Sequence, residues 1–262
     1  MIYLTSGLMS TFEDQDCELE SLITKVYSSE LALKSTEIGF SLLGISSINS
    51  EHFCQKLHQE ALSNFCLYEH ENMMRILIAL FGLQYSGKQI GETVKKLRNP
   101  FFNGPFVLKK LWQNRKLHKD DPKLTIGLKN HLHPSCQEAA NLIEYSILRL
   151  MLATETLFGR HGIDILNNHC QLRRLANVAI QIYAMIACVT RASRSYCIGL
   201  QHSDLEILIS KVICKNGTDL VKKNVSEILY EYDNADRMWG VLTDNLYKSK
   251  NYYFAHPLAR NF

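Results

Sequence analysis

Apolar residues recur at three- and four-residue steps from Pro134 to Gly199, a spacing that predicts two long antiparallel helices. The turn Gly159-Arg160-His161-Gly162 would join them. Pro134 suits a first helical position, where its missing N–H would have no partner in any case. Asp164 suits the N-cap of the second helix, because its carboxylate can accept hydrogen bonds from the free N–H groups of the first turn.

The second of these helices is apolar on nearly every side between Leu175 and Val189. A helix of that kind must be buried on every side. The apolar stretch is 15 residues long, shorter than the ~20 residues needed to cross a bilayer. We therefore expect it to be the central helix of a bundle, with a dry core around Val178, Ile182, Met185, Ile186 and Val189.

Helical periodicity also extends over most of the remaining chain. The opening MIYLTSGLMS resembles the end of an amphipathic helix and begins abruptly, as expected of a shortened chain. Ser203-x-x-Glu206 has the pattern of a capping box that opens a helix, and Asn216-Gly217 would close it. Further helices are predicted at about 17–43 (ended by Gly44), 51–62, 71–97, 218–232 and 235–248. Because few alternating β-branched runs occur, the predicted fold class is all-α, an antiparallel helical bundle.

A basic and aromatic segment, residues 99–130, interrupts this pattern with several turn signals. Between Lys95 and Lys129, ten basic residues face two acidic ones, a local excess of +8. A short helix over Phe106–Leu117 would bring apolar side chains together beside lysines. Such a surface suits peripheral contact with an anionic membrane, where basic residues meet charged headgroups and aromatic rings lie among them. The same composition also fits a solvated loop whose aromatic residues cover the bundle.

Composition excludes several other classes of protein. Hydrophobic residues make up 46% and charged residues 21% of the 262 residues, as in globular proteins. A formal charge of +3 is too small to indicate a nucleic-acid partner. The eight cysteines form no C-x-x-C pair, which indicates free thiols in a reducing compartment. His131-x-His133 has no cysteine or carboxylate partner at a metal-binding spacing, so we predict no metal site.

Several motifs follow one another as they do in the acyl-CoA dehydrogenases, flavin enzymes that desaturate fatty acyl-CoA. They are YLTSG at 3–7, TKVYSSE at 24–30, SLLG at 41–44 and MRILIALFGLQYSG at 74–87. The helix pair at 134–199 is similar to the additional C-terminal domain of the very-long-chain branch of that family. Within the branch, RASRSYCIGL at 191–200 and AHPLAR at 255–260 most resemble acyl-CoA dehydrogenase family member 9.

The resemblance concerns the C-terminal portion of the family and implies three parts. Residues 1–98 resemble part of the C-terminal helical domain, residues 99–130 a basic aromatic linker, and residues 131–262 the additional C-terminal helical domain. The family's N-terminal helical domain and middle β-domain, which hold most of the flavin and acyl-CoA contacts, are matched by no part of this sequence.

The family's catalytic signature is altered in this chain. In the family an aromatic residue precedes the catalytic Glu, and Gly-Thr-Asn follows it. Matching the aromatic–Glu pair makes Glu69 the candidate catalytic base, whereas an ungapped match puts Tyr68 at that position. The ungapped match also puts Glu69 on the family's glycine. By either match Gly-Thr-Asn is gone, and the bulky His70 and Glu71 stand in that region. The reaction needs a carboxylate to remove the α-proton of the thioester, and a tyrosine with a pKa of about 10 is a poor substitute.

The flavin contacts that the resemblance implies are altered as well. Ser41-Leu-Leu-Gly44-Ile45 stands where the family has Gln-x-x-Gly-Gly, and Ile45 would obstruct the close approach of backbone to the dinucleotide phosphates. Gln59-Glu60-Ala61-Leu62 replaces the family's Arg-Asp-x-Arg. We therefore expect no cofactor in this chain, although FAD is the cofactor of the family.

These changes favour an acyl-CoA dehydrogenase-like helical protein that no longer catalyses the reaction. Resemblance to member 9 implies a mitochondrial scaffold on the matrix side of the inner membrane and a role in the assembly of respiratory complex I. The implied partners are other assembly factors and a second copy of the chain. The alternative is part of a flavin-dependent long-chain acyl-CoA dehydrogenase whose N-terminal and β-domains are missing from this chain. A helical binding module outside the family is a third hypothesis.

Overall fold

The computed structural model describes residues 1–11, 16–49, 52–67, 70–118, 120–251, 254 and 258. These residues form helices joined by short 3-10 turns, without a strand among them, which confirms the all-α prediction. The helices are α1 (Ile2–Thr11), α2 (Glu18–Leu43), α3 (Phe53–Cys66), α4 (Glu71–Arg98), α5 (Pro100–His118), α6 (Gln137–His161), α7 (His169–Cys197), α8 (Ser203–Leu229) and α9 (Asp236–Ser249). The 3-10 turns are η1 (Gly44–Ile48), η2 (Leu128–His131), η3 (Pro134–Cys136), η4 (Gly162–Asn167) and η5 (Glu231–Asp233).

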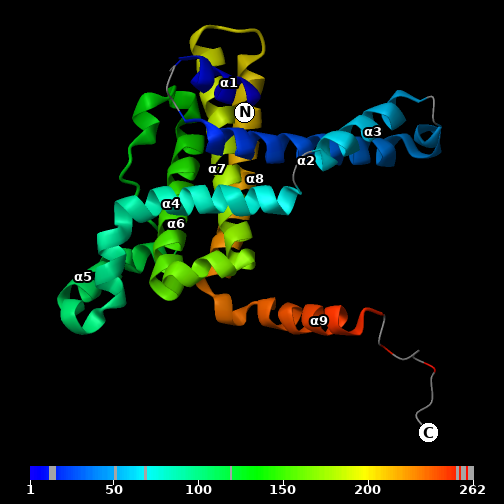
Figure 1. Cartoon of the computed structure of the whole chain (residues 1–262). Coiled ribbons are helices and arrows are strands. Elements are labelled where there is room, and N and C mark those ends of the chain that lie inside the picture. The colour runs from blue at the N-terminus through cyan, green and yellow to red at the C-terminus, as the bar shows by residue number, and fades with distance from the viewer. Residues whose placement is uncertain are drawn as a thin grey trace.

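Three long helices form the centre of the fold. Figure 1 shows α6, α7 and α8 side by side, each antiparallel to the one before it in the chain. The helix α4 crosses α6 and α7, and α2 packs against α4 and α7. The helix α3 folds back along the C-terminal half of α2, and this pair projects from the bundle as an arm. One continuous hydrophobic core therefore includes residues of α2, α4, α6, α7 and α8.

The central position predicted for the apolar helix is confirmed. In α7, Val178, Met185 and Val189 are fully buried and Ile182 nearly so, while Ile186 is half-buried. The helix is 29 residues long, and by length and composition alone it could cross a bilayer. Within the structure, however, 56% of its most apolar window is buried inside the protein. The packing of α4, α6 and α8 around it accounts for its apolar sequence.

The junction between α6 and α7 differs from its prediction. Gly162 ends α6 with a φ of 58°, and the six residues of η4 follow. Asp164 lies exposed within this turn, so its predicted role as the N-cap of α7 is wrong. Asn168 takes that role, because its side-chain oxygen accepts a hydrogen bond from the N–H of Gln171 at 3.3 Å. Pro134 does begin a helical turn, but the turn is η3, and α6 starts at Gln137.

The helix α8 begins at Ser203 as predicted, but its predicted cap and its predicted end differ. The capping box is wrong: His202 precedes the helix without a side-chain cap, and Glu206 instead contacts Arg191 and accepts a hydrogen bond from the Ser195 hydroxyl at 2.7 Å. Asn216-Gly217 does not close a helix, since α8 continues to Leu229. Close packing against α7, in which Gly217 contacts Met185, outweighs the local preference of glycine for a helix end.

The helices on the α4 side match their predictions better. Gly44 ends α2 with a φ of 60°, and its N–H donates to the Phe40 carbonyl. The helix α4 covers almost the predicted range, and α3 begins at Phe53. The helix α5 is longer than the predicted 106–117, because it starts at Pro100 and continues across a break at Asn103. Phe101 and Trp112 are exposed on it, at 99% and 76% of their surface.

Candidate functional site: the Arg75 cluster at the start of α4

The candidate base, Glu69, and its alternative, Tyr68, lie outside the residues that the structure describes. Their flanking residues are described. Leu67 follows α3, and His70 is the N-cap of α4, where its Nδ1 accepts a hydrogen bond from the N–H of Asn72 at 3.3 Å. His70, which stands on the family's glycine in the match that makes Glu69 the base, thus has a structural role. The role of Glu69 or Tyr68 as a base stays a prediction.

Arg75, one turn after Glu71, carries an almost completely buried guanidinium. Its Nη2 lies 2.5 Å from Glu30 Oε1 of α2, and its Nη1 lies 2.7 Å from Glu71 Oε1. The Nε atom donates to Asn177 Oδ1 of α7 at 2.8 Å. We call these four residues the Arg75 cluster. All three guanidinium nitrogens are engaged, so the cluster ties α2, α4 and α7 together.

The two carboxyl groups of the cluster have opposite pKa shifts. Burial raises the pKa of Glu71 to about 7, and a hydrogen bond shared with the Glu30 carboxylate acts in the same direction against the effect of Arg75. For Glu30, burial also acts upward, but hydrogen bonds with the Glu71 carboxyl and the Arg75 guanidinium outweigh it, and its pKa is lowered. Near neutral pH, Glu30 is therefore ionised, whereas Glu71 is partly protonated.

A groove of about 570 Å³ opens beside the cluster. Glu30 and Glu71 line it, together with the amides of Gln181 and Asn216 and the phenol of Tyr27. A carboxyl group with a pKa near 7 at the wall of a groove of this size can accept or donate a proton to a small molecule there. Sequence reasoning missed this arrangement, because Arg75 and Glu30 are 45 residues apart. The only local signal was the i,i+4 spacing of Glu71 and Arg75.

The residues at the end of α2 do not fit the flavin contact that the resemblance implies. The Ser41 hydroxyl donates to the Ile38 carbonyl of its own helix at 2.7 Å. Ile45 projects its side chain into solvent with 87% of its surface exposed, where the family's glycine would leave bare backbone. Gln59 and Leu62 of α3, which stand where the resemblance places the family's two arginines, are exposed and carry no charge. These residues therefore do not provide the flavin contacts that the resemblance implies.

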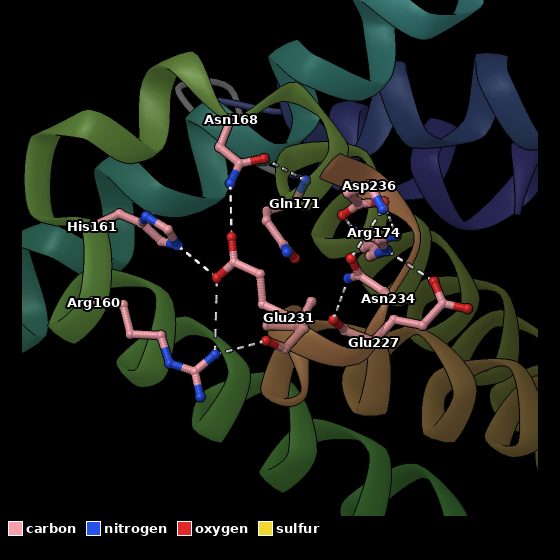
Figure 2. A network of polar contacts seen from close by, with 10 residues as sticks. Arg160, His161, Asn168, Gln171, Arg174, Glu227, Glu231, Asn234 and Asp236 are labelled. Atoms are coloured by element: carbon pink, nitrogen blue, oxygen red, sulfur yellow. Dashed lines mark hydrogen bonds and ion pairs between the residues drawn. The ribbon is translucent and has the colours of Figure 1, made fainter. Parts of the chain in front are cut away.

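A second polar cluster lies where the ends of α6 and α8 meet the starts of α7 and α9, as Figure 2 shows. Arg160 donates to the Ile228 and Leu229 carbonyls in the last turn of α8, at 3.0 and 2.7 Å. The Glu231 carboxylate lies 3.0 Å from His161 Nε2 and accepts a hydrogen bond from Asn168 Nδ2 at 3.2 Å. The two hydrogen bonds of Arg160 satisfy carbonyl groups that the end of α8 leaves free, while Glu231 links the side chains of His161 and Asn168.

The same cluster sets the start of α9. Arg174 forms two hydrogen bonds with the Asp236 carboxylate, at 2.5 and 2.8 Å, and one with Glu227 at 2.8 Å. Asn234 bridges the Glu227 carbonyl and the Asp236 N–H. Figure 2 shows these side chains pointing toward one another, while Figure 1 shows α9 extending away from the bundle. The ion pairs and hydrogen bonds of this cluster orient the helices, while the buried side-chain amide of Gln171 beside them has no hydrogen-bond partner among the described residues.

The raised pKa of Glu71 predicts a pH-dependent stability. The folded protein binds a proton at Glu71 more tightly than the unfolded chain, whose Glu has an ordinary pKa of 4.5. Stability should therefore fall as pH rises from about 4.5 to about 7. In Glu71→Gln this fall disappears. Between pH 5 and 8 the free energy of unfolding of the wild type should fall by about 1–2 kcal/mol relative to the variant. This is less than the whole pKa shift of Glu71 would give, because solvent around Glu30 weakens the interaction between the two carboxyl groups. Urea unfolding at four pH values measures this, and parallel profiles would contradict it.

The C-terminal half of the chain matches a known family model, and most of the chain is similar to curated proteins. Residues 134–252 match the family model described as ACAD9/ACADV, C-terminal domain. The mitochondrial very long-chain specific acyl-CoA dehydrogenase of Bos taurus is 26% identical over 233 residues, covering 87% of this chain and 34% of that protein. Its Homo sapiens counterpart is 25% identical over 233 residues, with the same coverage. The chain thus spans about a third of the length of these curated relatives.

A solved structure shares the fold. The crystal structure of acyl-CoA dehydrogenase complexed with FAD from Bacillus anthracis covers 97% of this chain, and 42% of that chain is matched, with a TM-score of 0.66. At 13% identity the match concerns the fold alone. The resemblance to the C-terminal portion of the acyl-CoA dehydrogenases is confirmed. The family model names both member 9 and the very-long-chain enzyme, and the relatives named here are very-long-chain enzymes.

Proposed function

We propose that this chain, which is similar to the C-terminal portion of the very-long-chain acyl-CoA dehydrogenases, acts by binding other proteins and does not dehydrogenate acyl-CoA by itself. The observation that carries the proposal is the use of His70 and Glu71. Both stand where the family has small residues next to its base, yet His70 caps α4 and Glu71 is bound to Arg75. Both side chains are therefore engaged in holding the start of α4, which supports a loss of the catalytic arrangement.

Exposed apolar side chains support a binding role. The arm of α2 and α3 and the helix α9 expose large residues that a monomer would normally bury, and such patches mark interaction sites. They include Leu42, Ile45, Phe53, Met238, Trp239 and Leu246. The names of the relatives place those proteins in mitochondria, and we propose the same location here, on the matrix side of the inner membrane. The partners proposed are a second copy of the chain and assembly factors of respiratory complex I.

The direct test is flavin binding and acyl-CoA oxidation by the purified chain. We expect a colourless protein, without the flavin absorption band at roughly 450 nm, and no oxidation of palmitoyl-CoA. The misfit at Ile45 and the replacement at His70-Glu71 are the reasons. A yellow preparation that palmitoyl-CoA bleaches would contradict the proposal. In that event Glu69→Gln should abolish the bleaching while the control Tyr68→Phe keeps it.

One observation favours a second function, part of a long-chain acyl-CoA dehydrogenase. Glu71 has a pKa of about 7 and faces a groove, as a general base would. In this reading, flavin and substrate domains outside this chain would complete the site. The same spectroscopic test separates the two functions, because only the second predicts reduction of a bound flavin by acyl-CoA.

We also propose that α5 contacts an anionic membrane surface. Phe101, Phe102 and Trp112 are exposed, and Lys109 lies among them, whereas Lys110 is paired with Glu155 at 2.8 Å. Liposomes rich in cardiolipin should retain the protein, and added salt should weaken retention because it screens the attraction. Changing Lys109, Arg115 and Lys116 to Gln should release it, and Lys110 is kept so that Glu155 stays paired. Equal retention by neutral liposomes would leave α5 an ordinary surface helix.

A further inference from the structure

One side of α4 lacks side chains near its middle, because two glycines, Gly87 and Gly91, lie there. At about 100° per residue, Gly87 and Gly91 fall within about a third of the helix circumference together with Leu80, Leu83, Gln84, Val94 and Lys95. A Cβ on Gly91 would meet nothing within 4 Å, and one on Gly87 would meet only Phe158 Cζ, at 3.6 Å. Open space therefore extends along this side of the helix.

A groove of about 570 Å³ lies against this side of α4. Its other wall is the end of α6 and the turn η4, and Ile163 of that turn has 81% of its surface exposed. Between Leu80 and Lys95 the helix rises about 22 Å, longer than the ~15 Å that one acyl chain spans in half of a bilayer core. The lining residues are Leu80, Leu83, Gln84, Val94, Lys95, Phe158, Gly162, Ile163, Ile165 and Leu166.

The residues that line this groove carry a single charge. Lys95 is the one ionisable residue among those that line it. Its neighbour Lys96 is turned to the Phe106 ring, 5.5 Å from the centroid. Within the described part of the chain, no ion pair occupies the Lys95 ammonium. The groove therefore combines a long apolar floor with a single positive charge toward one end, a pattern that fits an alkyl chain with one negative charge.

We propose that this groove binds a long-chain fatty acid anion, with the alkyl chain along the glycine side of α4 and the carboxylate at Lys95. A ligand with several phosphates would leave its further charges without partners, since the lining offers only one cation. The site is separate from the Arg75 cluster, and its occupancy does not depend on whether the chain catalyses any reaction.

Two leucine substitutions on α4 test the proposal as a matched pair. Gly91→Leu adds a side chain on the side of α4 that carries the groove-lining residues Gln84 and Val94, while Gly82→Leu fills a different pocket between α4, α6 and α7. Neither glycine has a neighbour within 4 Å of its Cβ position, and leucine favours a helix over glycine, so both variants should fold. Thermal midpoints of the full chain verify this before binding is measured.

Calorimetric titration with hexadecanoate, below its aggregation concentration, provides the measurement. We expect one site in the wild type and in Gly82→Leu, and at least about tenfold weaker binding in Gly91→Leu. Lys95→Gln should weaken hexadecanoate by about two- to fivefold and leave hexadecanol unchanged. Palmitoyl-CoA should bind no more tightly than hexadecanoate.

Several outcomes would overturn the proposal. Absence of binding to the wild type would do so, as would equal affinity of Gly91→Leu and Gly82→Leu for hexadecanoate. Sedimentation of the same samples measures the oligomeric state and tests whether a second copy of the chain occupies the groove instead. If Gly91→Leu changes the oligomeric state and leaves hexadecanoate binding intact, the groove is a contact between copies of the chain. A yellow, active preparation would refute the proposed function without affecting this result.

Discussion

Arg75→Ala should lower the free energy of unfolding by about 2–4 kcal/mol, because it leaves the largely buried Glu71 carboxyl and the partly exposed Glu30 carboxyl without their common cation. Arg75 is 6% exposed, and its contacts reach Glu30 on α2 and Asn177 on α7 as well as Glu71 on its own helix. Losing it therefore removes the polar link among three helices and adds the cost of desolvated charge. Urea unfolding followed by circular dichroism measures the change.

Two control variants separate charge from packing at this position. Arg75→Lys keeps the charge but cannot reproduce three directed hydrogen bonds, so it should recover only part of the lost stability. The triple change Arg75→Met, Glu30→Gln and Glu71→Gln removes all three charges and should lie within about 2 kcal/mol of the wild type. If Arg75→Ala alone has wild-type stability, the cluster is not a link between the helices.

Elements with a long apolar repeat were predictable because the pattern itself produces their burial. The helix predicted at 17–43 is observed at Glu18–Leu43, and the apolar stretch from Leu175 to Val189 is buried among helices. Local signals failed where distant side chains compete for the same groups. Glu206 had the spacing of a capping box, but Arg191 and Ser195 on α7 hold its carboxylate instead.

The candidate site was less predictable than the fold for the same reason. From the sequence, Glu71 stands out only as a bulky residue where the family has a small one. Its pKa depends on burial and on Glu30, and neither can be seen in the neighbouring sequence. For residues 99–130 the sequence fitted both a solvated loop and a segment that contacts an anionic membrane surface, because basic and aromatic residues are common to both. Periodicity reports which face of a helix is apolar, whereas partners of charged side chains depend on which helices meet.

Gly217 illustrates how a helix contact can override a turn signal, and it leads to the second large prediction. A Cβ at this position would lie 2.8 Å from Met185 Sδ and 3.0 Å from Met185 Cγ, closer than real Cβ atoms approach. Met185 is fully buried and cannot move into solvent. Any side chain at this position therefore requires Met185 to shift within the buried contact between α7 and α8. Its cost in helix propensity, about 1 kcal/mol relative to alanine, is the smaller effect.

Gly217→Leu should accordingly lower the free energy of unfolding by about 2–4 kcal/mol, because the added side chain forces α7 and α8 apart. Met185→Ala by itself should cost about 2–5 kcal/mol through the cavity that it leaves. Combined, the two changes should cost about 1–3 kcal/mol less than the sum of the single effects, since leucine then occupies the space of the missing methionine. Gly159→Leu, at a helical glycine without close neighbours, is the matched control and should be nearly neutral. Urea unfolding of the four variants and the wild type gives the coupling directly. Strict additivity would show that Gly217 and Met185 do not share the contact on which the packing of α7 against α8 depends.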